Sequence, residues 1–192
     1  MKTRLLSSVL GIILFITVCA PASVLFAAFA ASPKANTNQP AKTSQPAEAS
    51  VYKFKEAGIQ FTVPAGWEAK AEEGAVKVSP KSGGMAQIAF IALPISKDMD
   101  DEDRADLFNT IVEKSKPAGA KLGDYVANET MGGMRVSLRP YEGKNNGHEV
   151  QGMYFLLSAE KMVSIVLVID KAAGDALSTD AENIINSVKK IE

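Results

Sequence analysis

The segment GIQFTVPAGW, residues 58–67, predicts a strand followed by a sharp turn. Apolar and polar residues alternate along Ile59–Val63, which is the period of a strand buried on one face. Pro64-Ala65-Gly66 then interrupts the strand, because proline lacks an amide donor and glycine favours turns. Trp67 opens the next short strand.

Similar patterns recur along the chain and predict further strands. They fall at residues 52–54, at a short stretch that begins at 67, around 76–78, and at 85–95, 121–130, 134–141, 148–158 and 162–169. The run 85–95 is apolar almost throughout, which indicates an interior strand buried on both faces. Residues 148–158 and 162–169 are expected to pair as antiparallel strands, whereas Glu142–Gly147 is expected to be a polar turn.

The segment Asp100–Lys116 changes to the helical period. Its apolar face consists of Ala105, Leu107, Phe108, Ile111 and Val112. Acidic residues crowd its start, where the helix dipole favours negative charge, and Pro117 ends it. The sequence therefore predicts a helix between two blocks of strands.

A second helix is expected at the C-terminus. The residues with helical spacing are Leu177, Ala181, Ile184, Ile185, Val188 and Ile191. Thr179 and Glu182 have the spacing of a capping box, and Lys189 and Lys190 suit a helix C-terminus. Blocks of strands with helices between and after them predict an α+β fold, a largely antiparallel sheet with two main helices packed on it.

The first 31 residues have the pattern of a secretion signal. Lys2 and Arg4 precede a long apolar run, and Ala28-Phe29-Ala30 fits a cleavage site, with Ala20-Pro21-Ala22 as a second possibility. The apolar run is also long enough to remain as an N-terminal anchor. Cys19 could alternatively be lipidated, since residues 16–19 loosely resemble a lipobox. Each alternative predicts an exported protein, periplasmic or in the cell envelope, either secreted or tethered to a membrane.

Residues 32–50 have no aromatic or large aliphatic side chain, so we expect a disordered polar linker. Residues 51–192 then have the mixed pattern and the size of a single domain. The chain as a whole is 46% hydrophobic and 22% charged, with a net charge of −1. This balance argues against a nucleic-acid partner, which would require a basic surface. Cys19 is the only cysteine, so the domain has no disulfide.

The segment 58–67 resembles the entry of the PsbP-like superfamily, whose members include PsbP, DcrB and Mog proteins. Ile184-Ile185-Asn186-Ser187-Val188-Lys189 is similar to the closing helix of that superfamily, and the order of elements between the two also matches. The resemblance covers about residues 50–192 and is one of fold. It implies a PsbP-like α/β/α sandwich and a role in binding or assembly, with no shared catalytic residues to transfer.

Metal and phosphate sites are not expected. His148 is the only histidine and is interpreted as a solvated residue at a strand edge. A calcium loop starting at Asp98 would need Gly at position 103 and Glu at 109, where Asp103 and Asn109 stand, so the acidic run Asp98–Asp106 is assigned to the helix start. Gly83-Gly84 and Gly132-Gly133 match no phosphate-binding pattern and are interpreted as turns.

Catalytic residues are not expected either. Ser158 and Lys161 have S-x-x-K spacing, but the accompanying β-lactamase motifs are missing from the sequence. Trp67 is expected to be a core or rim aromatic, and Arg135 and Arg139 to share a solvated sheet face.

We therefore expect a non-enzymatic envelope protein without cofactor, metal or catalytic site, acting as a protein-binding or assembly accessory module. The alternative is a carrier of a small molecule or lipid, with a pocket between sheet and helix. Membrane contact is expected only through the N-terminal segment.

Overall fold

The computed structural model describes residues 48–84, 86–96 and 98–192. The predicted leader 1–31, with Cys19, and the predicted linker as far as residue 47 lie outside the described residues. Within those ranges, no helix combines the length and the apolar character needed to cross a membrane.

The larger sheet has eight strands, and every pairing in it is antiparallel. Its strands are β3 (Trp67–Glu72), β4 (Ala75–Pro80), β5 (Ala86–Ser96), β6 (Lys121–Leu122), β7 (Val126–Met131), β8 (Met134–Asn145), β9 (His148–Ser158) and β10 (Lys161–Asp170). They lie in the order β3-β4-β5-β10-β9-β8-β6, and β7 also pairs with β8. The predicted interior strand, β5, lies between β4 and β10, and the predicted β9–β10 pair is confirmed.

A smaller sheet joins the two ends of the described chain. Its strands are β1 (Ser50–Phe54), β2 (Ile59–Val63) and β11 (Lys189–Lys190), in the order β1-β2-β11. The alternation seen in the sequence buries the apolar residues of β2, whereas Gln60 and Thr62 are only half-buried. The Phe61 ring stacks on Phe90 of β5 at 4.2 Å between centroids, so the small sheet packs onto the large one.

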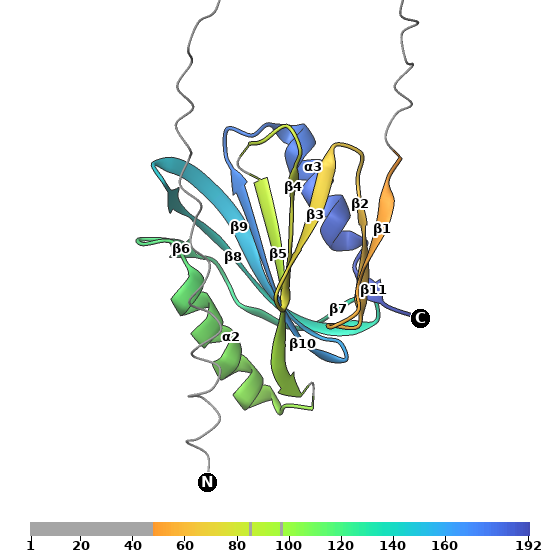
Figure 1. Cartoon of the computed structure of the whole chain (residues 1–192). Helices are drawn as coiled ribbons and strands as arrows, with labels where there is room; N and C mark the ends of the chain where they lie inside the picture. The colour runs from red at the N-terminus through yellow and green to blue at the C-terminus, as the bar shows by residue number, and fades with distance from the viewer. Residues whose placement is uncertain (1–47, 85, 97) are drawn as a thin grey trace, which may run out of the picture.

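Two helices cover opposite faces of the larger sheet (Figure 1). Helix α3 (Asp175–Asn186) shares one hydrophobic core with the small sheet and with β4, β5 and β10. Helix α2 (Asp101–Ser115) packs Phe108, Ile111 and Val112 into a second core on the other face. The predicted α+β class, with a largely antiparallel sheet and two main helices, is confirmed.

The predicted polar turn at 142–147 is wrong, because β8 continues to Asn145. Only Asn146 and Gly147 turn the chain, with φ angles of 50° and 85°. Positive φ at both central residues is the geometry of the tightest hairpin turn, and Asn-Gly is its preferred sequence. The predicted strand 121–130 is likewise divided into β6 and β7.

The predicted start and end of the C-terminal helix are also wrong. Helix α3 begins at Asp175 after Gly174, which provides no side-chain cap, and Thr179 lies inside the helix. The helix ends because the Ser187 hydroxyl donates to the Ile184 carbonyl at 2.7 Å and accepts from the Thr62 amide at 2.8 Å. Lys189 and Lys190 consequently form strand β11 beside β2, and are not part of the helix.

Candidate functional site

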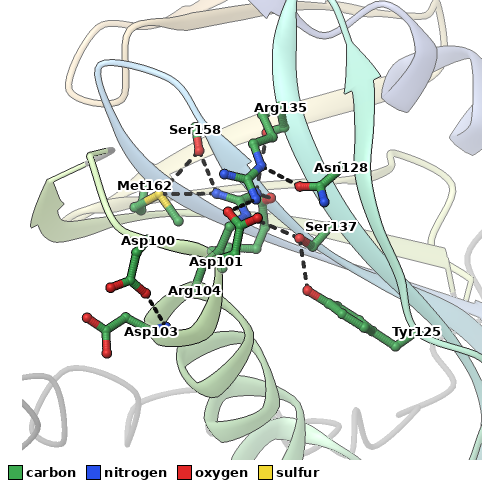
Figure 2. A network of polar contacts seen from close by, with 11 residues as sticks. Asp100, Asp101, Asp103, Arg104, Tyr125, Asn128, Arg135, Ser137, Ser158 and Met162 are labelled. Atoms are coloured by element: carbon green, nitrogen blue, oxygen red, sulfur yellow. Dashed lines mark hydrogen bonds and ion pairs between the residues drawn. The ribbon is translucent and has the colours of Figure 1, made fainter.

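The most connected group of polar side chains in the described structure surrounds Arg104 (Figure 2). Arg104 lies on α2 and is only 2% exposed. Its Nε donates to Ser137 Oγ of β8 at 3.1 Å. The two terminal nitrogens donate to Ser158 Oγ, Met162 Sδ (3.6 Å), the Arg135 carbonyl (3.4 Å) and the Leu156 carbonyl. One side chain thus joins α2 to strands β8, β9 and β10.

The acceptors around Arg104 are all neutral. A guanidinium has five N–H donors, and the five contacts match that number, so no donor is left for a ligand. Burial, and then the charge of Arg135, lower the pKa of Arg104, whereas Tyr125 and Asp101 act in the opposite direction. The arrangement is therefore suited to fixing α2 on the sheet and not to binding an anion.

Sequence reasoning missed Arg104. It interpreted the start of this helix as a crowd of acidic residues, and listed only apolar residues on the buried face. The signal was nevertheless present, because Arg104 precedes Phe108 by four residues and Ile111 by seven. That spacing places all three residues on one side of a helix.

The acidic run before Arg104 starts the helix, as predicted. Asp100 is the N-cap, and its Oδ1 accepts a hydrogen bond from the Asp103 amide at 2.8 Å. Asp101–Asp103 fill the first turn, where the helix dipole stabilises negative charge. No group of three or more potential metal-ligating side chains occurs among the residues that the structure describes.

Arg135 and Arg139 share a sheet face, as predicted, and both are half-buried with solvent-exposed contacts, so this face is partly solvated. They flank Ser137, which is fully buried beneath α2. Arg135 donates from Nε to Asn128 Oδ1 at 2.7 Å and forms an ion pair with Asp101 of the helix. Arg139 donates to the Gly123 carbonyl at 3.0 Å. Both arginines thus fix neighbouring segments to the sheet.

The remaining polar candidates lie beside two turns of the larger sheet, Ser158 and Lys161 at the β9–β10 turn and His148 at the β8–β9 turn. Ser158 ends β9 and contacts Arg104, whereas Lys161 begins β10 and is exposed. His148 is 56% exposed at the start of β9, and its Nδ1 lies 2.9 Å from Asp170 Oδ2. The interpretation of His148 as an exposed strand-end residue is confirmed.

Two buried tyrosines lie on the α2 face of the larger sheet. The rings of Tyr141 and Tyr154 have centroids 4.8 Å apart, and the Tyr141 hydroxyl donates to the Leu167 carbonyl at 3.2 Å. The Tyr154 hydroxyl has no hydrogen-bond partner among the described residues. Burial raises the pKa of Tyr154 to about 12; the Ser115 hydroxyl lies close enough to oppose this rise but donates its own hydrogen bond to the Ile111 carbonyl, at 2.6 Å, and not to Tyr154. The sequence pattern did not distinguish these tyrosines from ordinary strand residues.

Trp67 is a core residue, as expected, and is 3% exposed. Its Nε1 donates to Asp180 Oδ2 of α3 at 2.9 Å. The entry segment that carried the PsbP-like resemblance is thus bound directly to the closing helix that also carried it.

Strand β7 is the most exposed strand of the larger sheet. It pairs with β8 alone in the described structure, and all its residues from Val126 to Thr130 are exposed. Tyr125 and Val126, each 36% exposed, are two of the three exposed large hydrophobic residues in the described ranges. The Tyr125 ring packs against Phe108 at 5.3 Å, and its hydroxyl donates to Ser137, so the start of β7 is held against α2.

The chain matches no family model and no curated protein. It is similar in structure to cyanobacterial PsbP (CyanoP) from Synechocystis sp. PCC 6803, with a TM-score of 0.56 and 15% identity over 80% of this chain and 98% of that one. It is also similar to a protein from Bacteroides thetaiotaomicron, with a TM-score of 0.50, 10% identity and 76% of this chain covered. This chain spans 50% of that protein. LpqN, involved in cell envelope biogenesis of Mycobacterium tuberculosis, matches with a TM-score of 0.42 and 15% identity over 78% of this chain and 88% of that one.

The likeness to CyanoP confirms the fold-level resemblance to the PsbP-like superfamily. The match spans nearly all of that protein, so the two share the whole domain architecture.

Proposed function

We propose that this chain is an exported, non-enzymatic accessory protein of the cell envelope, and that it binds a partner protein at strand β7. The observation that carries the proposal is the open edge of β7 with two adjacent exposed hydrophobic residues, Tyr125 and Val126, at its start. The predicted secretion signal at residues 1–31 supports the envelope location.

An unpaired strand edge offers backbone donors and acceptors to an extended segment of another protein. Apolar side chains beside such an edge add contact area and specificity. At β7 the edge is held in place, because Tyr125 packs on Phe108 and Asn128 accepts from Arg135. A rigid edge loses less conformational entropy when the partner binds.

The use of the chemically reactive side chains supports a non-catalytic role. Ser137 and Ser158 accept hydrogen bonds from Arg104, which gives both hydroxyls a structural task. His148 begins β9 and is paired with Asp170 of β10, whereas Ser158 lies at the far end of β9. These contacts give Ser137, Ser158 and His148 structural roles.

The test is cross-linking of the full chain, with a C-terminal affinity tag, in native envelopes. We expect one dominant partner protein, and we expect Val126→Lys to reduce its recovery at least several-fold. Ala71→Lys is the control, since Ala71 is exposed on β3, at the opposite edge of the larger sheet. Equal loss of the partner with both variants, or with neither, would argue against β7.

The carrier alternative has its own outcome in the same preparation. A lipid or metabolite seen by intact mass spectrometry, without a protein partner, would replace the binding-module proposal with that of a carrier.

A further inference from the structure

The outer face of the small sheet is basic. Lys53 of β1 and Lys189 of β11 both lie directly opposite Gln60 of β2. Residues directly opposite one another in a sheet project from the same face, so the two lysines flank Gln60 in one row. Val51 and Thr62, two residues farther along their strands, lie on that face as well.

This row faces away from the core. The opposite face of β2 buries Ile59, Phe61 and Val63 beneath the sheet, whereas Lys53 and Lys189 are exposed. Strands about 4.8 Å apart place the two lysine backbones about 10 Å from each other. The result is a flat face with two cations, a neutral centre and an exposed valine.

The lysines on and beside this face have no counter-charge within it. The three strands contain no acidic residue; Glu56 lies in the turn after β1, and Glu192 is the C-terminal residue. Lys55, in the turn after β1, adds one exposed cation at its margin, whereas Lys190 lies opposite Ile59 and belongs to the other side of the sheet. None of these three lysines, Lys53, Lys55 and Lys189, takes part in an ion pair in the described ranges, whereas Lys70, Lys77, Lys116 and Lys171 each do.

The position of this face along the chain points to its occupant. β1 is the first strand that follows the predicted leader and linker, and it lies in the layer opposite α2 with its acidic first turn (Figure 1). The predicted linker, residues 32–50, has 19 residues, and a random coil of that length would average roughly 25 Å end to end. A leader retained in the membrane, or a lipid on Cys19, would therefore hold β1 near the bilayer at a high effective concentration.

We propose that the outer face of the small sheet docks on an anionic lipid surface. Lys53 and Lys189, with Lys55 at the margin, contact the headgroup phosphates, and Val51, which is 61% exposed and lies two residues before Lys53 on β1, enters the interface beside them. The end of β7 approaches Lys189 through the Gly132 turn, whereas Val126 lies at the other end of that strand.

The test uses the full chain in vesicles of phosphatidylcholine, with or without phosphatidylglycerol. Amine acetylation, read by mass spectrometry, measures the exposure of each lysine. We expect acetylation of Lys53 and Lys189 to slow several-fold in the anionic vesicles and to recover in high salt, which screens charge. Exposed Lys144 of β8 should react at the same rate in both vesicles.

A variant pair separates docking from general charge. Lys53→Gln with Lys189→Gln should lower the docking equilibrium constant roughly 30-fold, from about fivefold for each lysine near an anionic membrane, as read from acetylation of the remaining Lys55. Lys70→Gln with Lys144→Gln removes the same charge elsewhere and should leave docking unchanged.

Equal acetylation of Lys53 in both vesicles would overturn the proposal, and so would equal effects of the two variant pairs. Protection of Lys53 only when envelope proteins are added would assign the face to a protein in place of lipid. These outcomes are independent of the β7 experiment, which uses different residues and a different readout.

Discussion

The indole nitrogen of Trp67 donates a 2.9 Å hydrogen bond to the carboxylate of Asp180, joining β3 to helix α3. The two residues are 113 positions apart in the sequence. Trp67 ends the segment that opens the domain, and Asp180 lies in the helix that closes it. This bond fixes α3 over the core shared by both sheets.

Asp180→Ala should therefore lower the free energy of unfolding by about 1–2 kcal/mol, because a hydrogen bond to a charged acceptor is lost. Asp180→Asn keeps an acceptor and should lose less. The fluorescence of Trp67, the only tryptophan, reports the contact directly during urea unfolding. Glu182→Ala is the control, because Glu182 is exposed and caps nothing; a loss equal to that of Asp180→Ala would contradict the assignment.

Arg104 should be among the most sensitive positions in the domain. Arg104→Ala removes five hydrogen bonds and leaves buried acceptors unpaired, so we expect a loss of about 3 kcal/mol or more. Arg104→Lys keeps the charge but not the planar set of donors, and should also destabilise. Arg139→Ala, whose contact with the Gly123 carbonyl is exposed, should change stability by about 0.5 kcal/mol or less. Similar losses in the free energy of unfolding at both positions would show that the buried hydrogen bonds of Arg104 stabilise the fold no more than one exposed contact does.

Adjacent glycines in the turn between β7 and β8 provide a matched pair. Gly132 and Gly133 both have positive φ, at 53° and 74°. A Cβ on Gly132 would lie 2.1 Å from the Val188 carbonyl oxygen, whereas one on Gly133 would meet nothing within 4 Å. Gly133→Ala should cost about 1–2 kcal/mol through its backbone angle alone. Gly132→Ala should cost at least about 2 kcal/mol more, measured by chemical denaturation, and equal costs would contradict the close approach to Val188.

The raised pKa of Tyr154 predicts a loss of stability at alkaline pH. A folded-state pKa of about 12, above the ordinary 10.0, means that the folded protein holds the proton more tightly than the unfolded chain. The stability from Tyr154 is therefore complete below pH 10 and declines as pH rises through about 12. Tyr154→Phe should flatten this decline and cost little at neutral pH, because the lost hydroxyl has no partner. An unchanged alkaline decline would refute this origin.

Strand alternation and helical period gave most of the architecture, because burial on one face leaves a local pattern. The boundaries that failed depend on contacts between distant residues. Ser187 ends α3 by accepting from Thr62, and Lys189 becomes a strand only because β2 lies beside it. The long β8 was shortened in the prediction because its polar end, Glu142–Asn145, is paired with β9 rather than buried.

The candidate sites also divide into those that the local sequence determines and those that depend on contacts between distant residues. His148 and the acidic helix start were interpreted correctly from residue type and spacing, since each depends on its immediate surroundings. Arg104 was missed because its burial depends on which strands pack against α2. The β7 edge was missed because it depends on the pairing of β7 with β8, which leaves the other side of β7 open. The Asn146-Gly147 turn lies within the predicted turn 142–147, and the preference of Asn-Gly for two-residue turns is the local signal that limits the turn to those two residues.

Photo-cross-linking from β7 tests the proposed binding role most directly. A photoreactive residue at Val126 of the full chain, irradiated in native envelopes, should capture one protein, and the same residue at Lys70 on β3, at the opposite edge of the larger sheet, should not. Capture of the same set of proteins from both positions, or no capture from Val126, would contradict the account.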